Sequence, residues 1–102
     1  MGMVVSLQTE RGEDIKSAGD PRNLLGGLLP SLDDSTYQLL RFIDPYGDTV
    51  FNRLQIDTFI AEWRQLYRYA KTDDEHQVIK QVEELAEACR EQPHRYLKFI
   101  GD

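Results

Sequence analysis

The chain has 102 residues, 40% of them hydrophobic and 29% charged, a size and composition that predict one folded domain and exclude wholesale disorder. The formal net charge is −6, from 18 acidic and 12 basic residues, which disfavours binding to nucleic acid or anionic membranes and favours a basic protein partner. A single cysteine, Cys89, excludes an intrachain disulfide, and no stretch has the pattern of a signal peptide or a membrane span, so we expect a cytoplasmic protein.

The first third of the chain predicts one strand and a long loop. Residues 3–9 (MVVSLQT) are apolar and β-branched, as is typical of a strand. Residues 10–35 break this pattern with four glycines and two prolines and predict a loop, in which Asp20 and Pro21 begin one helical turn that stops at Gly26. The five leucines between residues 24 and 32 are too apolar for solvent, so we expect them to pack on the domain or to contact a partner.

The middle of the chain predicts a hairpin. Residues 36–43 (TYQLLRFI) predict a second strand whose alternate side chains face opposite sides of the sheet. Residues 44–47 (DPYG) have the order that a type I turn prefers, with Asp first, Pro second and Gly fourth. Residues 49–51 (TVF) then predict a short returning strand.

Two helices and a last strand follow. Residues 53–70 carry apolar side chains at steps of three and four and predict a helix, begun either by Asn52 with Gln55 or by Asp57 alone. Residues 72–75 (TDDE) form a capping box that predicts the start of a second helix, which Pro93 ends. Residues 95–100 (RYLKFI) predict the final strand.

These elements predict an α+β fold of one domain, residues 1–102. About four strands, in the order β-β-β-α-α-β, form a small antiparallel or mixed sheet, because two apolar helix stripes need one sheet face to cover. Both helices would then lie on one face. The other face stays open, unless the leucines of the predicted 10–35 loop cover it.

The search for catalytic and metal-binding patterns favours binding over catalysis. Asp44 and Asp48 flank a turn but lack the alternating spacing of a calcium loop, and Cys89, His76 and His94 lack paired zinc-ligand spacing. Cys89 falls on the apolar stripe of the second helix, which is typical of a buried core cysteine. We therefore predict no metal, cofactor or catalytic residue, and a small enzyme using carboxylates and His94 is kept as an alternative.

Besides the leucine-rich segment, two surfaces are candidates for binding. Asp44, Tyr46 and Asp48 at the predicted turn, continued by Asp33 and Asp34, would form an acidic surface with an exposed tyrosine, suited to a basic protein. Glu13 and Asp14 would join this surface if the loops meet. The alternative is the open sheet face, where the predicted strands place the side chains of Tyr37, Arg41, Tyr96 and Lys98. Aromatic and basic residues on a sheet can stack RNA bases, but the net negative charge disfavours nucleic acid.

Residues 41–52 (RFIDPYGDTVFN) and the closing residues 96–102 (YLKFIGD) resemble small uncharacterised bacterial domains. Some of these are similar to the immunity proteins of polymorphic toxin systems. The resemblance implies a short, acidic, cytoplasmic, non-enzymatic protein that blocks the active surface of a toxin, and it assigns no residue a role. The leading hypothesis is a binding module that neutralises a basic partner. A homodimeric structural or accessory subunit, joined through the open sheet face or the leucine-rich loop, is the alternative.

Overall fold

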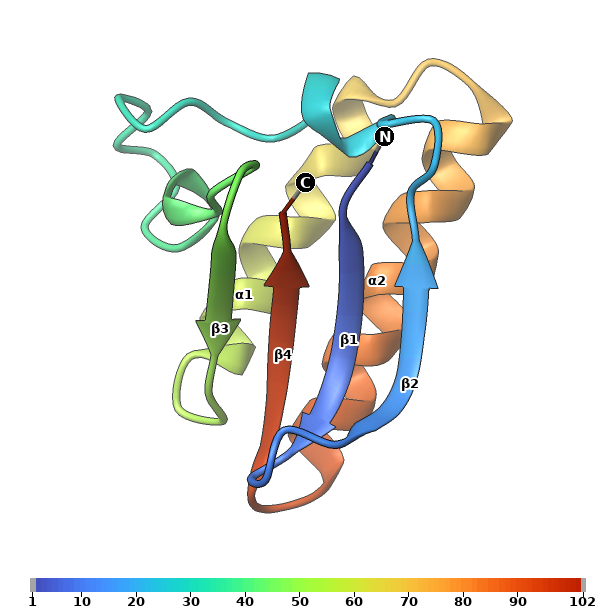
Figure 1. The fold of residues 1–102 in the computed structure, drawn as a ribbon. Helices are drawn as coiled ribbons and strands as arrows, with labels where there is room; N and C mark the ends of the chain where they lie inside the picture. Colours follow the sequence, from blue (N-terminus) through green and yellow to red (C-terminus); the bar gives the residue numbers. More distant parts are fainter. Residues whose placement is uncertain (1, 102) are drawn as a thin grey trace.

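Four antiparallel strands form one sheet, and two helices lie across one of its faces, which confirms the predicted α+β fold (Figure 1). The computed structural model describes residues 2–101. In chain order the elements are β1 (Val4–Thr9), β2 (Asp14–Gly19), the 3₁₀ turns η1 (Leu25–Gly27) and η2 (Leu40–Phe42), β3 (Asp48–Phe51), α1 (Ile56–Arg64), the 3₁₀ turn η3 (Gln65–Tyr69), α2 (Asp73–Glu91) and β4 (Arg95–Ile100). No helix in the described part of the chain is both long and apolar enough to span a membrane.

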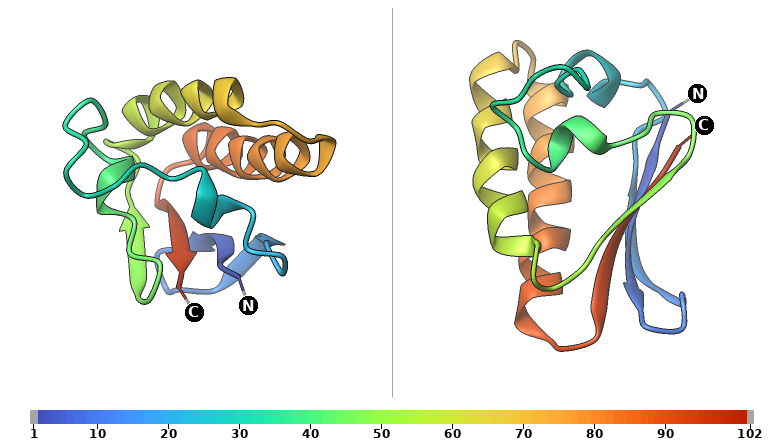
Figure 2. Two further views of the ribbon diagram at one scale, coloured as in Figure 1. Left: turned by 90° about the horizontal axis from the view of Figure 1, so that it is seen from above. Right: turned by 90° about the vertical axis from the view of Figure 1, so that its left-hand side faces the viewer.

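The first and last strands of the chain are neighbours at the centre of the sheet, whose order is β2-β1-β4-β3. Val5 stands opposite Phe99 and Leu7 opposite Leu97, and all four side chains are buried. Because side chains alternate along a strand, these four face the helices, and the intervening Ser6 and Lys98 belong to the other face. Figure 2 shows that the helices cover one face only.

The second strand in chain order is not the predicted one. β2 (Asp14–Gly19) lies inside the predicted 10–35 loop, whereas residues 36–43 form turns, so the predicted strand and its hairpin with residues 49–51 are wrong. β2 is an edge strand that pairs with β1 through backbone hydrogen bonds. Most of its side chains are exposed, so its sequence lacks the apolar alternation that is typical of a strand. In residues 36–43 the buried side chains are Tyr37, Leu40 and Ile43, and this spacing of three suits 3₁₀ geometry.

The second helix begins as its sequence predicts, whereas α1 begins at Ile56, three residues after the predicted start, with no side-chain cap on its N-cap residue Gln55. The Asn52 side chain accepts hydrogen bonds from the backbone N–H groups of Leu54 and Gln55, one turn before α1. Thr72 and Glu75 form the predicted capping box of α2, which ends at Glu91, two residues before Pro93. The predicted 53–70 helix is split, since residues 65–69 tighten into η3.

An aromatic cluster joins the helices to the sheet. Phe59 stacks on Trp63 with ring centroids 5.3 Å apart, and Phe99 of β4 packs against both rings. The indole Nε1 of Trp63 donates a 2.9 Å hydrogen bond to the backbone oxygen of Ile79, which ties α1 to α2. The core therefore lies between the helix layer and the covered sheet face.

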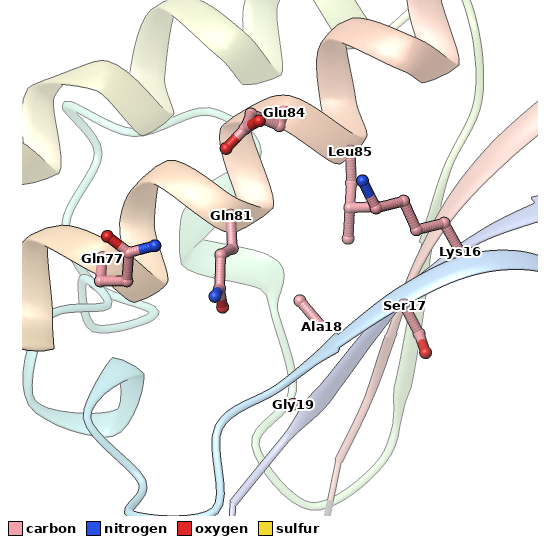
Figure 3. A pocket seen from close by; sticks show the side chains of 8 residues that line it. All are labelled: Lys16, Ser17, Ala18, Gly19, Gln77, Gln81, Glu84 and Leu85. Carbon is pink, nitrogen blue, oxygen red and sulfur yellow. The ribbon is translucent and has the colours of Figure 1, made fainter.

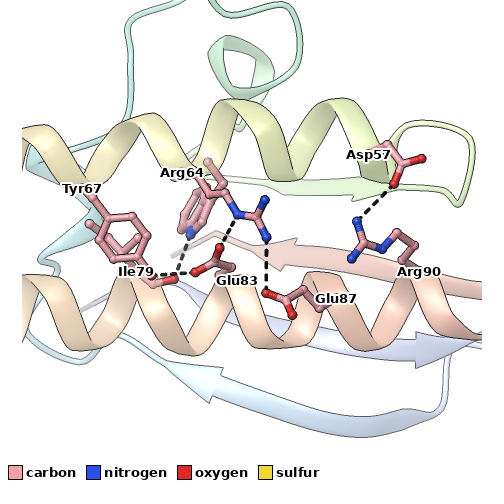
Figure 4. A network of polar contacts seen from close by, with 8 residues as sticks. Asp57, Arg64, Tyr67, Ile79, Glu83, Glu87 and Arg90 are labelled. Atoms are coloured by element: carbon pink, nitrogen blue, oxygen red, sulfur yellow. Dashed lines mark hydrogen bonds and ion pairs between the residues drawn. The ribbon is translucent and has the colours of Figure 1, made fainter.

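Polar side chains connect α1, η3 and α2 on the outside of the helix pair (Figure 4). Arg64 Nε lies 2.6 Å from one carboxylate oxygen of Glu83, and the Tyr67 hydroxyl donates a 2.7 Å hydrogen bond to the other. Burial acts to raise the pKa of Glu83, but the hydrogen bonds from Arg64 and Tyr67 outweigh it and hold this pKa below its ordinary value.

Four of the five leucines between residues 24 and 32 pack on the domain, one of the two predicted outcomes, but not over the open sheet face, and the fifth, Leu32, is exposed. Leu25 and Leu28 are buried at one end of the core, where η1 contacts α2 (Figure 2). The buried Asp20 side chain accepts hydrogen bonds of 2.8 Å from the backbone N–H groups of Leu24 and Leu25, but the helical turn predicted from Asp20 to Gly26 forms only over Leu25–Gly27. The open face therefore stays uncovered.

Candidate interaction surface

The predicted turn at residues 44–47 forms and is held at the edge of the molecule. The backbone N–H of Tyr46 donates to Asp44 Oδ1, and the backbone N–H of Asp44 donates to Thr49 Oγ1, both at 2.9 Å. The backbone N–H of Gly101 donates a 2.7 Å hydrogen bond to the Gly47 oxygen, at an approach so close that a Cβ on residue 101 would collide with it. The Tyr46 side chain projects into solvent and is 85% exposed.

Two loops meet beside this turn and enclose a hollow. Both loops belong to the segment that runs from η1 to β3 (Figure 1). Residues 30–32 and 41–45 of these loops line a space of about 350 Å³. The Arg41 guanidinium lies 4.6 Å from the centre of the Phe42 ring and donates to the Leu32 backbone oxygen at 3.4 Å. Leu32 is 61% exposed and Phe42 53% exposed, so two large apolar side chains face solvent beside Tyr46.

Three of the four carboxylates predicted for this surface lie along the same two loops, and the fourth, Asp48, is the first residue of β3. Asp33 and Asp34 directly follow Leu32, and Asp44 lines the hollow. Asp34 accepts a 3.1 Å hydrogen bond from the Thr36 backbone N–H, and Asp48 lies 3.5 Å from Lys98 Nζ. The sequence places these residues in separate loops, and the structure brings the loops together.

Glu13 and Asp14 do not join this surface. They lie at the far end of the sheet, because β4 runs from Arg95, opposite Thr9, to Ile100, opposite Asp48. There the Asp14 carboxylate accepts 2.7 Å hydrogen bonds from Ser6 and Gln8, and these bonds lower its pKa.

A buried carboxylate that the sequence analysis missed holds one of the two loops. Glu62 of α1 is only 6% exposed, and its carboxylate accepts backbone hydrogen bonds from Gln38, Leu39 and Leu40 at 2.7, 3.0 and 3.1 Å. These bonds replace the strand pairing that residues 36–43 lack. The available signal was a charged residue three positions after Phe59, within the apolar stripe of the helix.

The alternative sheet-face surface does not form as predicted. Tyr96 and Lys98 lie on the open face of β4, but Tyr37 is buried and Arg41 belongs to the hollow beside β3. The reason is that residues 36–43 are not a strand, so their side chains do not share a face with β4. Val4 and Val50, both exposed, also lie on this open face.

Another hollow lies between the edge strand β2 and α2 (Figure 3). Its volume is about 510 Å³, and residues 16–19 face Gln77, Gln81, Glu84 and Leu85 across it. Lys16 and Glu84 are its charged side chains, and it contains neither histidine nor cysteine.

Cys89, His76 and His94 occupy three separate environments. Cys89 is fully buried on α2, as predicted for a core cysteine, and burial raises the pKa of its thiol. His76 Nδ1 lies 2.9 Å from the Thr72 backbone oxygen at the start of α2, and His94 lies 3.5 Å from Glu10 beyond its end. Within residues 2–101 no three His, Cys, Asp or Glu side chains are grouped closely enough to hold a metal ion.

Comparisons by sequence and by structure find no matching family model, curated protein or solved structure. A functional proposal must therefore rest on the structure itself. Its basis is the surface formed by residues 30–34 and 41–48, which we call the loop surface.

Proposed function

We propose that the chain is a non-enzymatic, cytoplasmic binding module that neutralises a basic protein, as an immunity-like protein would neutralise a toxin. The loop surface would contact the partner. Leu32, Phe42 and Tyr46 would supply apolar contacts, and Asp33, Asp34, Asp44 and Asp48 would supply the charge.

The observation that carries the proposal is the exposure of three large apolar side chains on two meeting loops. Leu32, Phe42 and Tyr46 are each more than half exposed, beside a hollow of about 350 Å³. Apolar area removed from water contributes about 25 cal/mol per Å², and exposed aromatic residues beside a pocket are typical of binding hot spots. An apolar patch with a polar margin is typical of a protein-binding site.

The surrounding charge favours a basic partner over a second copy of the chain. Four carboxylates stand on the loop surface against Arg41 and Lys98, in a chain of net charge −6. Two copies joined through this surface would bring like charges together, whereas a basic protein would be attracted and its association accelerated. The homodimer alternative therefore depends on the open sheet face, where Val4 and Val50 are exposed.

The test uses two substitutions that remove no hydrogen bond or ion pair found within residues 2–101. Asp33→Lys and Tyr46→Ala would be combined in one double variant. A pull-down from an extract of the source cell would compare the proteins that bind the wild type with those that bind the double variant. Glu91→Lys, on the last turn of α2, makes the same change in charge far from the loop surface and serves as the control.

We expect one basic protein to bind the wild type and the Glu91→Lys control alike. The double variant should bind it with a Kd on the order of tenfold higher, and its association should be slower at low salt. A partner that binds the double variant as tightly as the wild type would contradict the proposal that the loop surface is the binding site. A stable dimer of the chain in light scattering, with no basic partner retained, would favour the homodimer alternative.

A further inference from the structure

A notch opens in the sheet at the end opposite the loop surface. β3 pairs with β4 only as far as Phe51 opposite Leu97, while β4 extends back to Arg95. Gly101 donates its N–H to the Gly47 oxygen, so the odd-numbered residues of β4 direct their backbone groups toward β3. The backbone N–H of Arg95 therefore faces the space that β3 has left.

Basic residues line this notch. Residues 52–54 and 93–96 line a hollow of about 370 Å³, which brings Arg53, His94 and Arg95 to one place in a chain of net charge −6. Neither arginine forms an ion pair with any side chain in residues 2–101, whereas three of the other arginines do. Glu10 is the carboxylate closest to the group, 3.5 Å from His94 Nδ1.

The backbone at His94 is in an unfavourable conformation. Its φ is +58°, in the left-handed region, at a position after Pro93 where a turn favours glycine or asparagine. Residues other than glycine persist in this region at a cost in free energy, and such strain is concentrated at functional sites. This strained residue, His94, lies at the margin of the hollow.

We propose that this notch binds a phosphate monoester. Guanidinium groups form paired, charge-assisted hydrogen bonds with phosphate oxygens, and the Arg95 backbone N–H adds a neutral donor. Leu54, which is 92% exposed, and Pro93 provide an apolar wall for the organic part of the ligand. The volume of the hollow falls near the lower end of the roughly 300–1,000 Å³ found for small-molecule sites.

The net negative charge of the chain does not prevent this binding. At physiological ionic strength the Debye length is about 8 Å, so the carboxylates at the far end of the sheet are screened from the notch. Glu10 is close enough to compete with a phosphate for His94 and the arginines. Phosphate binding here and protein binding at the loop surface concern opposite ends of the sheet and can fail separately.

The test is a titration of the full chain followed by ¹H–¹⁵N NMR. Inorganic phosphate is the minimal probe, phosphoserine tests the monoester, and sodium chloride at matched ionic strength tests for simple screening. We expect saturable shifts confined to residues 52–54 and 93–96, with a Kd on the order of 1 mM for either phosphate probe.

Three variants should change the affinity for phosphate in different ways. Arg53→Gln should weaken phosphate binding by about fivefold or more, because one charge-assisted pair is lost. Glu10→Gln should strengthen binding, because the competing carboxylate becomes neutral. Arg68→Gln, an equal change in charge on the exposed part of η3, should leave binding unchanged. Circular dichroism melting would confirm that each variant folds.

The proposal is overturned if chloride causes the same shifts, or if Arg53→Gln and Arg68→Gln behave alike. It is also overturned if Glu10→Gln weakens binding, because the basic groups would then depend on Glu10 for their placement. Binding of inorganic phosphate without phosphoserine would overturn the assignment to a monoester.

Discussion

At the scale of single residues, Glu62 determines where half of the loop surface lies. Its buried carboxylate accepts three consecutive backbone N–H groups, and these groups belong to the segment that leads into Arg41 and Phe42. Buried polar groups are expensive unless hydrogen bonded, so the carboxylate and the three donors depend on one another. One side chain on α1 thus stabilises the surface that we propose binds the partner.

Glu62→Ala should lower the free energy of unfolding by about 3–5 kcal/mol, because three backbone donors lose their acceptor in a buried site. Urea unfolding followed by Trp63 fluorescence would measure the change. Glu62→Gln keeps the shape and one acceptor oxygen, so it should cost less. A loss under about 1 kcal/mol for the alanine variant would mean that the loop holds its place without this carboxylate.

At the scale of elements, the two helices are joined by an apolar seam inside and by charged side chains outside. Trp63 and Ile79 connect them within the core, and Glu83 receives Arg64 and Tyr67 at its margin (Figure 4). Because the pKa of Glu83 is lower in the folded chain than in the unfolded one, its contribution to stability is full above the unfolded pKa. This contribution is lost as the pH falls through the folded pKa.

Glu83→Gln should therefore weaken the acid dependence of stability. We expect the wild-type Tm to fall as the pH drops below about 4.5, the ordinary pKa of a glutamate, and the variant to show a smaller fall. At neutral pH the variant should be less stable by about 1 kcal/mol, since Arg64 is half exposed and its ion pair is partly screened. Parallel Tm profiles for the two proteins would contradict this role of Glu83.

At the scale of the whole molecule, one continuous core supports two ends of different character. The loop surface is acidic and apolar, and the notch at the opposite end of the sheet is basic. Both lie beyond the ends of β3, where the chain leaves the sheet for the loops on either side. Cys89 reports on the core between them, because it is fully buried on α2 and its thiol has a raised pKa.

Cys89 should react with a thiol reagent only when the whole domain opens. Under native conditions we expect its labelling to be slower than that of an unfolded control by the factor that the global free energy of unfolding predicts. Labelling rates across a urea series, compared with the equilibrium unfolding curve, would measure this. Labelling that is fast and independent of urea would show that α2 moves away from the core locally.

Much of the fold follows from short stretches of sequence. The capping box at Thr72 and the proline at residue 93 delimit α2, the order Asp-Pro-Tyr-Gly forms the turn, and residues 95–100 form β4. Each of these features depends on hydrogen bonds or side-chain periodicity within a few residues. The apolar stripes, which predict two helices on one sheet face, are also read from the sequence alone. The net charge is a further property of the sequence.

Tertiary structure decided the parts of the fold in which one segment depends on another that is distant in the sequence. Residues 14–19 become a strand because β1 offers them a free edge, and residues 36–43 become turns because Glu62 takes their backbone donors. The same holds for both candidate sites, since the hollow beside β3 joins residues 30–32 to residues 41–45 and the notch joins residues 52–54 to residues 93–96. Local pattern cannot choose such partners, because the free energy of each contact exists only after the core has brought the segments together.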